Sequence, residues 1–400
     1  MEHVLELRCE PIPLVRIGLI GLGGRGMKTL ERYVYIPGAA ITAIADTDDA
    51  RMEAANDCLM RTGRPRADMH AGSEGWREIC RRPDIDLVYI CTDWSTHCRM
   101  AVEAMTEGKH VAVEVPAATT MDECHRLVET AERYRRHCFM TENCCYDHFA
   151  LATLEMKAQG LLGDITHCEG AYIHNLRDTF GLTGNAATAT LGWMERCCAH
   201  HRGNPYPTHG IGPIGWLLGL HRGDRMDYLT SLTSRGGGSD ELLGRVNTTL
   251  IRTVGGASIM LQLDVTSMRP YSRLQTVVGT QGYVQKYPLP TVKTPQTDTI
   301  LTADDALAYA DGFHTSHAAR LWQEGRAKGV PNEMNYTMDA RLIYCLQHGL
   351  PLDIDVYDAA EWSCLAELSE RSAREGSRPV SIPDFTHGHW QDLCGHRIHV

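Results

Sequence analysis

The sequence predicts an α/β protein of two domains, a first domain built on a parallel sheet and a second, α+β domain with a largely antiparallel sheet. Three observations carry this prediction. From residue 15 to about residue 142, short β-branched runs alternate with amphipathic stretches, which is typical of βαβ units. After about residue 143, strand-like runs follow one another across short turns. The 400 residues also exceed the size at which one hydrophobic core stops growing.

Five runs of the first domain have the composition of strands. They are VRIGLIG at 15–21, ITAIAD at 41–46, LVYICT at 87–92, HVAVEV at 110–115 and HCFMTE at 137–142. Helical stretches separate them, among them residues 96–107 and 121–135. We therefore expect a first domain over residues 1–143 and a second over 144–400, whose C-terminal segment could pack back on the first.

The second domain begins with a predicted helix over 146–159, followed by the strand-like ITHCEGAYIH at 165–174. Three further runs, NTTLIRTV, ASIMLQLDVTS and RLQTVVGT, lie between residues 247 and 280 and are separated by Gly-Gly or Arg-Pro turns. Helices are predicted around 334–348 and 357–375. No repeat or low-complexity linker is seen.

Composition and charge argue against several classes of partner and cellular location. Thirty-nine Lys and Arg against 50 Asp and Glu give a net charge of −11, which disfavours nucleic acid and anionic membranes as partners. The acidic N-terminus does not resemble a signal peptide, and no stretch is apolar enough to span a bilayer. Fifteen cysteines without C-x-x-C pairs indicate reduced thiols. We expect a cytoplasmic protein that acts on a small molecule.

A glycine-rich motif directly follows the first predicted strand and opens a helix. It reads Gly21-Leu22-Gly23-Gly24-Arg25-Gly26, a G-x-G-x-x-G. Its glycines permit a tight turn, a close approach of the backbone to a pyrophosphate, and close packing of helix on strand. Asp46 ends the second strand twenty residues later, where a carboxylate would bind ribose hydroxyls and repel a 2′-phosphate. The pattern predicts a Rossmann domain that binds NAD, the alternative being a glycine turn that has lost its cofactor.

Further cofactor contacts are expected from residues at the ends of later strands. Thr92, Trp94 and His97 follow the strand at 87–92 and would border the nicotinamide. Thr96, in the same stretch, could simply cap a helix. Glu114 and Glu142 each stand at the end of a strand.

The strand-end motif Glu114-Val115-Pro116, together with the predicted domain order, resembles the Gfo/Idh/MocA oxidoreductase superfamily. Most dehydrogenases of that group have Glu-Lys-Pro here, and their lysine helps to polarise the hydroxyl that is oxidised. Val115 can neither donate nor accept a proton.

The EVPAA version of this motif is found in one branch, glycoside hydrolase family 109, which the chain resembles over nearly its whole length. The similar strings are DIDLVYICTDWSTH at 84–97, GKHVAVEVPAA at 108–118, TENCCYD at 141–147, EGAYIHNLRD at 169–178, GNPYPTHGIGPI at 203–214, HRGDRM at 221–226, RPYSRLQTVVGTQGYVQKYP at 269–288 and DVYDAAEWSCLAELS at 355–369.

The resemblance implies an NAD-dependent α-N-acetylgalactosaminidase that hydrolyses through oxidation. In that reaction C3 of the sugar is oxidised, a base removes the C2 proton, the aglycone leaves from C1, water adds and C3 is reduced again. The resemblance also places Glu142, Tyr172, Tyr206 and His209 in the active site. His209 would take the C3 hydroxyl proton. Tyr172 or Tyr206 would act at C2 or at the leaving oxygen, and we favour Tyr172. Glu142 would hold a sugar hydroxyl or the ribose of the cofactor.

Plainer interpretations stand beside these. A tyrosine on a strand is commonly a packing residue, and His209 could merely follow a capping Thr208. His200, His201 and His209 match no common zinc spacing, so we expect no metal. The pairs Cys144-Cys145 and Cys197-Cys198 fit packing thiols.

One segment departs from the family pattern. Family members usually have Trp-Arg where this chain has Trp193-Met194, and their arginine helps to hold the sugar. Arg196, two positions on, could substitute as a sugar ligand. The loop at 178–192 is shorter than usual, which bears on sugar specificity.

Two other functions compete with the glycosidase. One is a sugar or cyclitol dehydrogenase, and the other is a non-catalytic NAD-dependent sensor. We also expect a homo-oligomer, because the exposed face of the antiparallel sheet is rich in apolar residues.

Overall fold

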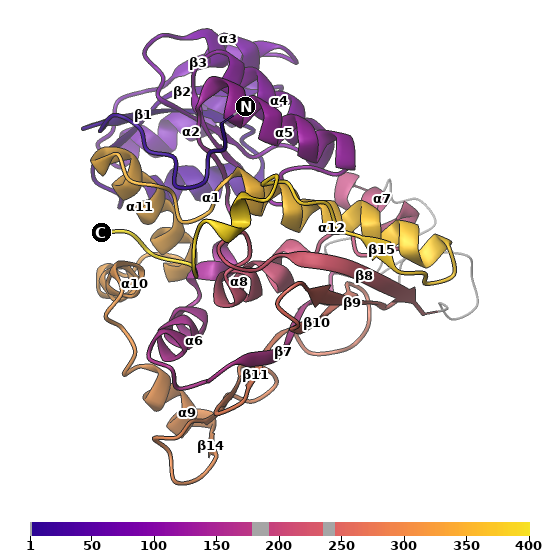
Figure 1. Ribbon diagram of the computed structural model, residues 1–400. Coiled ribbons are helices and arrows are strands. Elements are labelled where there is room, and N and C mark those ends of the chain that lie inside the picture. Colours follow the sequence, from indigo (N-terminus) through magenta and orange to yellow (C-terminus); the bar gives the residue numbers. More distant parts are fainter. Residues whose placement is uncertain (1, 178–191, 235–244) are drawn as a thin grey trace. The chain divides into compact units, whose positions relative to one another are not determined.

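The computed structural model describes residues 2–177, 192–234 and 245–400 (Figure 1). The chain divides into two compact units. Unit 1 comprises Met1–Tyr146, Ser316–Ala360 and Arg397–Val400, and unit 2 comprises Asp147–Thr315 and Glu361–His396. The division falls three residues after the boundary expected at 143, and it assigns residues 316–360 to the first unit rather than the second.

Unit 1 is built on a six-stranded sheet in which every pair is parallel. Its strands are β1 (Val15–Ile20), β2 (Ala39–Asp46), β3 (Asp68–Ala71), β4 (Leu87–Ile90), β5 (His110–Val113) and β6 (Cys138–Met140). Their order, β3-β2-β1-β4-β5-β6, is that of a dinucleotide-binding Rossmann sheet. The three strands β4, β5 and β6 are wholly buried, which explains their unbroken apolar runs. The predicted parallel sheet of the first domain is confirmed. It contains one strand, β3, that the sequence analysis did not predict.

Helices cover this sheet. They are α1 (Gly24–Tyr33), α2 (Asp49–Arg61), α3 (Gly75–Arg81), α4 (Trp94–Thr106) and α5 (Met121–Tyr134). Asp93, not Thr96, caps α4 by accepting from the Ser95 N–H, because the helix already begins at Trp94. Thr96 instead donates to the Asp93 carbonyl.

Two later helices, α10 (His317–Lys328) and α11 (Glu333–His348), complete unit 1. Asp339 of α11 is fully buried and accepts from Arg32 Nε at 3.0 Å and from Tyr89 Oη at 3.1 Å. Removing one partner of such a buried pair costs about 3–5 kcal/mol. These bonds explain why the segment belongs with the first sheet, although it lies some 200 residues after the end of β6.

Unit 2 is built on a nine-stranded sheet in the order β14-β13-β12-β11-β7-β10-β9-β8-β15. Its strands are β7 (Ile165–Ile173), β8 (Met226–Thr233), β9 (Asn247–Thr253), β10 (Ser258–Asp264), β11 (Ser272–Gly279), β12 (Tyr283–Gln285), β13 (Thr291–Lys293), β14 (Leu301–Thr302) and β15 (Val380–Ser381). The pair β7 and β10 is parallel, and the other pairs are antiparallel. The predicted largely antiparallel sheet is confirmed.

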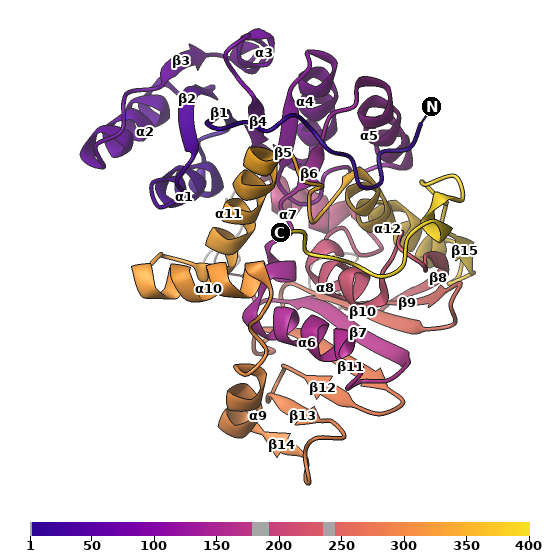
Figure 2. The same ribbon diagram turned by 60° about the vertical axis from the view of Figure 1, so that its left-hand side comes forward.

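The helices of unit 2 are α6 (His148–Ala158), α7 (Trp193–His200), α8 (Thr208–Leu218), α9 (Ala303–Ala310) and most of α12 (Val356–Arg374). Helix α8 packs very closely on β7, since a Cβ added at Gly170 would lie 2.3 Å from the Gly210 carbonyl oxygen. A glycine at this point therefore brings the start of α8, with His209, against the strand that carries Tyr172. Figure 2 shows α8, α6 and the strands of this unit from a second side.

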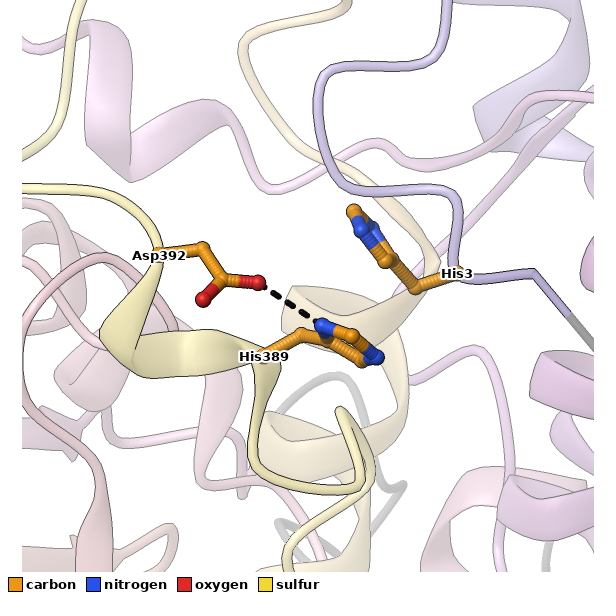
Figure 3. Close-up of side chains that lie close together, drawn as sticks. All are labelled: His3, His389 and Asp392. Carbon is orange, nitrogen blue, oxygen red and sulfur yellow. Dashed lines mark hydrogen bonds and ion pairs between the residues drawn. The ribbon is translucent and has the colours of Figure 1, made fainter.

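The C-terminal part of unit 2 ends in irregular structure around a short 3-10 turn, His389–Gln391. There His389 Nδ1 lies 2.7 Å from a carboxylate oxygen of Asp392 (Figure 3). All fifteen cysteines are free thiols, and most of them are buried. Within the described ranges, no helix has both the length and the apolar character needed to cross a bilayer.

Candidate active site

The glycine motif of unit 1 forms a turn that other residues could not form. Gly21 has φ +87°, and a Cβ there would lie 2.6 Å from the Cys91 carbonyl oxygen. A Cβ at Gly26 would lie only 1.9 Å from the Gly21 carbonyl oxygen. Both glycines are therefore required for the turn and for the packing of α1 against the sheet.

Gly23 and Gly24 have the opposite surroundings. A Cβ at either would meet nothing within 4 Å, so their backbone borders open space. Gly23 is the N-cap of α1, no side chain caps this end, and no acidic residue occupies the first turn. Free helical N–H groups and the positive end of the helix dipole thus face room for an anion. The turn fits the pyrophosphate of a dinucleotide.

Asp46 lies beside this turn. One carboxylate oxygen accepts from the Leu22 N–H at 2.6 Å and the other from the Asp48 N–H at 3.0 Å. The side chain is only 6% exposed. Asp46 therefore holds the glycine turn to the end of β2, and each oxygen keeps a second lone pair with which to accept from a ribose hydroxyl.

Arg25 and Glu114 are joined to each other. Arg25 Nε donates to Glu114 Oε1 at 2.6 Å, and Arg25 Nη2 lies 3.3 Å from Asn335 Oδ1. The same amide oxygen accepts from Asn143 Nδ2 at 2.8 Å. Sequence reasoning missed both asparagines, since Asn335 reaches this site from α11, 310 residues after Arg25.

His97, which the sequence predicts to contact the cofactor, has its ring between two backbone carbonyls of unit 1. It is fully buried, with Nδ1 at 2.8 Å from the Pro116 carbonyl oxygen and Nε2 at 3.1 Å from that of Thr92. The ring thus ties the end of β4 to the turn after β5. Thr92 Oγ1 lies 2.7 Å from Thr96 Oγ1, and Trp94 is buried in the first turn of α4.

Unit 2 gathers four aromatic and imidazole side chains into one cluster. Tyr172 Oη lies 3.0 Å from His174 Nδ1, and Tyr206 Oη lies 2.9 Å from His209 Nε2. The Tyr172 ring joins the two pairs, with its centroid 4.8 Å from that of Tyr206 and 5.3 Å from that of His209. The sequence predicted three of these residues. His174 was missed, although period-two alternation along β7 places it on the face of Tyr172.

The cluster rests on an apolar floor. Buried Leu176, Cys198, Leu263 and Val265 make this floor, and Tyr172, Met194 and Tyr206 pack against it. Arg196 is exposed and lies two positions after Met194 on α7, so the helix turns it to another face. The side chains of Arg196 and Met194 therefore point in different directions from α7. Residues 178–191 of the variable loop lie outside the described residues.

Electrostatics favour a neutral His174. Burial, followed by the nearby His209, lowers the pKa of His174. A neutral imidazole with its proton on Nε2 accepts a hydrogen bond at Nδ1, so the Tyr172 hydroxyl can donate to it. This pairing gives a phenol a neighbour that can receive its proton.

Glu142 and Val115 belong to unit 1. Glu142 is fully buried and one carboxylate oxygen accepts from the Cys144 N–H at 3.0 Å. Val115 is 4% exposed, so the position that is lysine in dehydrogenases is here a buried apolar side chain.

The three histidines considered as metal ligands are not brought together. His201 Nε2 lies 3.4 Å from Glu370, His209 bonds Tyr206, and His200 is exposed.

Comparison with known proteins decides the family. The model of the glycosyl hydrolase 109 C-terminal domain matches residues 146–243 and 240–392, and that of the oxidoreductase family with an NAD-binding Rossmann fold matches residues 15–142. An alpha-N-acetylgalactosaminidase of Bacteroides fragilis is 50% identical over 407 residues, covering 97% of this chain and 96% of that protein. The chain belongs to glycosyl hydrolase family 109.

Other relatives agree with this assignment. Glycosyl hydrolase family 109 protein 2 of Phocaeicola vulgatus is 50% identical over 413 residues, covering 98% of this chain and 99% of that protein. Among solved structures, a levoglucosan dehydrogenase in complex with NADH and levoglucosan has a TM-score of 0.71 at 18% identity, covering 92% of this chain and 100% of that one. An NAD-binding oxidoreductase from Klebsiella pneumoniae has the same TM-score at 19% identity, covering 93% and 100%. At this identity these structures show a shared fold. The family and its Rossmann domain make NAD the cofactor.

Proposed function

We propose that this family 109 enzyme cleaves α-linked N-acetylgalactosaminides or closely related glycosides through transient oxidation at C3. The observation that carries the proposal is the pairing of two phenols with two imidazoles in one cluster. The reaction has to move protons at two places on the sugar, the C3 hydroxyl and C2. The cluster supplies one phenol–imidazole pair for each.

The residues of unit 1 are assigned to the cofactor. Gly23, Gly24 and the start of α1 would hold its pyrophosphate, and Asp46 would hold a ribose. NAD, when bound, supplies the acceptor and later the donor of a hydride at C3. Glu142 would orient a sugar or ribose hydroxyl.

The residues of unit 2 are assigned to proton transfer. His209, hydrogen-bonded to Tyr206, would take the C3 hydroxyl proton. Tyr172 would remove the C2 proton after passing its own proton to His174. A free phenol has a pKa of about 10, so Tyr172 would also need a nearby positive charge, such as the nicotinamide ring of bound NAD, to act as a base near neutral pH. This route differs from that of glycosidases in which two carboxylates flank the glycosidic bond.

Cleavage of an aryl α-N-acetylgalactosaminide in D2O tests the proposal. The enzyme should release the phenol without accumulating NADH, and the released sugar should carry deuterium at C2. Release with hydrogen retained at C2 would contradict the elimination. Stoichiometric NADH from a free sugar or cyclitol, without release of an aglycone, would favour the dehydrogenase instead.

A homo-oligomer and a cytoplasmic location remain part of the proposal. Leu232 of β8 and Leu250 of β9 are 64% and 50% exposed, which supports burial of this sheet face against a second copy. Sedimentation at micromolar concentration should give more than the monomer mass of 44.5 kDa. Replacing Leu250 by Glu should then shift the protein toward the monomer.

A further inference from the structure

A cavity of about 640 Å3 lies in unit 1, at the sheet edge where β4 and β5 begin. Its walls are the N-terminal segment (residues 7–10 and 12), the residues that lead into the two strands (83, 85–86 and 108–110), and the two residues after α5. Figure 2 shows the N-terminal segment passing along this edge toward α5. Rossmann folds bind their dinucleotide at the carboxyl ends of the strands. This cavity lies at the amino ends and is therefore separate from the glycine turn.

Positive charge predominates in the cavity. Its basic residues are Arg8, Lys109, Arg135 and Arg136, and its acidic residues are Glu10 and Asp86. Asp86 is already matched, because both of its oxygens accept from the Arg16 guanidinium at 2.9 Å. Glu10 is the remaining negative charge.

Two of the four basic side chains, Lys109 and Arg136, bond carbonyls at the ends of helices, whereas Arg135 Nη1 donates to the His3 carbonyl at 2.7 Å. Lys109 donates to the carbonyl of Arg82, the C-cap of α3, and Arg136 Nε donates to that of Gly108, just after α4, at 2.6 Å. Arg136 Nη1 donates at 3.0 Å to the carbonyl of Arg135, the C-cap of α5. Each helix end carries about half a negative charge. Three such ends and Glu10 offset about 2.5 of the four positive charges, which leaves a surplus of about 1.5.

Donor groups remain available for a ligand. Arg8 is exposed and has no hydrogen bond or ion pair to any residue in the described ranges. Arg136 uses two of its five N–H groups in the two bonds given above. His110 Nδ1 accepts from the His137 N–H at 3.2 Å, so the neutral ring carries its proton on Nε2 and can donate. Burial, followed by Arg136, lowers the pKa of His110 to about 4, which keeps the ring neutral at physiological pH.

We propose that this cavity binds a small organic phosphate ester, with Arg8 and Arg136 as the principal ligands of the phosphate group. A phosphate dianion matches the charge surplus, and guanidinium groups bind phosphate oxygens in a bidentate manner. The side chains of Leu7, Ile12 and Pro83 supply an apolar wall for the organic part. The volume lies within the range of about 300–1,000 Å3 that is usual for small-molecule sites. The whole chain has a net charge of −11 and therefore repels anions overall. The positive surplus is a local property of this cavity.

Calorimetric titration of the NAD-saturated enzyme with phenyl phosphate tests the proposal, since NAD then blocks the glycine turn. Binding should be measurable with a Kd of about 1 mM or below. Arg136→Gln and Arg8→Gln should each weaken it about tenfold or more, because each removes a charged donor. Arg126→Gln is the matched control: Arg126 is an exposed residue of α5 that does not line the cavity, and its loss should change the Kd less than about twofold.

Two further measurements keep the test decisive. NAD affinity should be equal in all variants, which shows that each is folded, and Arg8→Gln decides the matter if Arg136→Gln fails this check. Phenyl glucoside, which lacks the charge, should not compete with phenyl phosphate. Absence of binding at about 10 mM, or equal binding by Arg8→Gln and Arg126→Gln, would overturn the proposal. The glycosidase assay is not needed, so this result stands apart from that of the proposed function.

Discussion

Replacement by alanine should affect the stability of the protein very differently at two glycines of the same motif, Gly26 and Gly23. At Gly26 a Cβ would lie 1.9 Å from the Gly21 carbonyl oxygen, whereas Cβ atoms in proteins do not approach other atoms within 3.0 Å. The turn has to open by more than 1 Å, and overpacking of this kind costs about 1–3 kcal/mol or more, since the opposing atom is backbone. Gly26→Ala should lower the free energy of unfolding by that amount and should also weaken NAD binding.

At Gly23 a Cβ would meet nothing within 4 Å, and φ −64° with ψ −172° suits any residue. Gly23→Ala should therefore leave the stability of the cofactor-free protein within about 0.5 kcal/mol of the parent. It should still weaken NAD binding by about 10–100-fold, because the methyl group displaces the pyrophosphate from one or two backbone N–H groups. Urea unfolding and fluorescence titration with NADH measure the two effects. Equal stability of both variants, or unchanged NADH affinity in Gly23→Ala, would refute the reasoning.

Three further predictions concern separate parts of the molecule. Tyr172→Phe should lower kcat by about 100-fold or more with unchanged NADH affinity, and a smaller loss in steady-state assays would speak against a base at this position. Asp353→Ala should cost about 3–5 kcal/mol in urea unfolding, because it strands Arg341, whose side chain is 0% exposed. His110 is buried with a pKa of about 4 against about 6.5 when unfolded, so the unfolded state binds more protons between these values and stability falls as pH drops through them. His110→Gln should remove roughly 3 kcal/mol of that fall, and an unchanged pH profile of unfolding would contradict it.

Local patterns predicted much of unit 1. The strands at 15–20, 39–46 and 87–90 follow from apolar runs between turns, and the glycine motif identified the turn that Gly21 and Gly26 require. Asp46 was located correctly beside that turn, although its bond to the Leu22 N–H was not foreseen. Such features depend on residues close together in the chain, which is why the sequence reveals them.

Features that depend on distant residues were not predictable in the same way. The bond between Arg32 and Asp339 joins residues 307 apart, and it places α11 with the first sheet rather than the second domain. Asn335 reaches Arg25 for the same reason. The sequence did not reveal that Met194 and Arg196 lie on different faces of α7, because this depends on the helix that the segment forms.

The discontinuous make-up of unit 1 has a consequence for biosynthesis. A ribosome that has released residues 1–146 has delivered every strand of the first sheet, but the carboxylate that neutralises Arg32 and receives the Tyr89 hydroxyl arrives only with residue 339. Until then Arg32 lacks the carboxylate with which it pairs in the complete chain. Completion of this domain must therefore wait for most of the chain, and residues 147–315 of unit 2 are synthesised before residue 339 is.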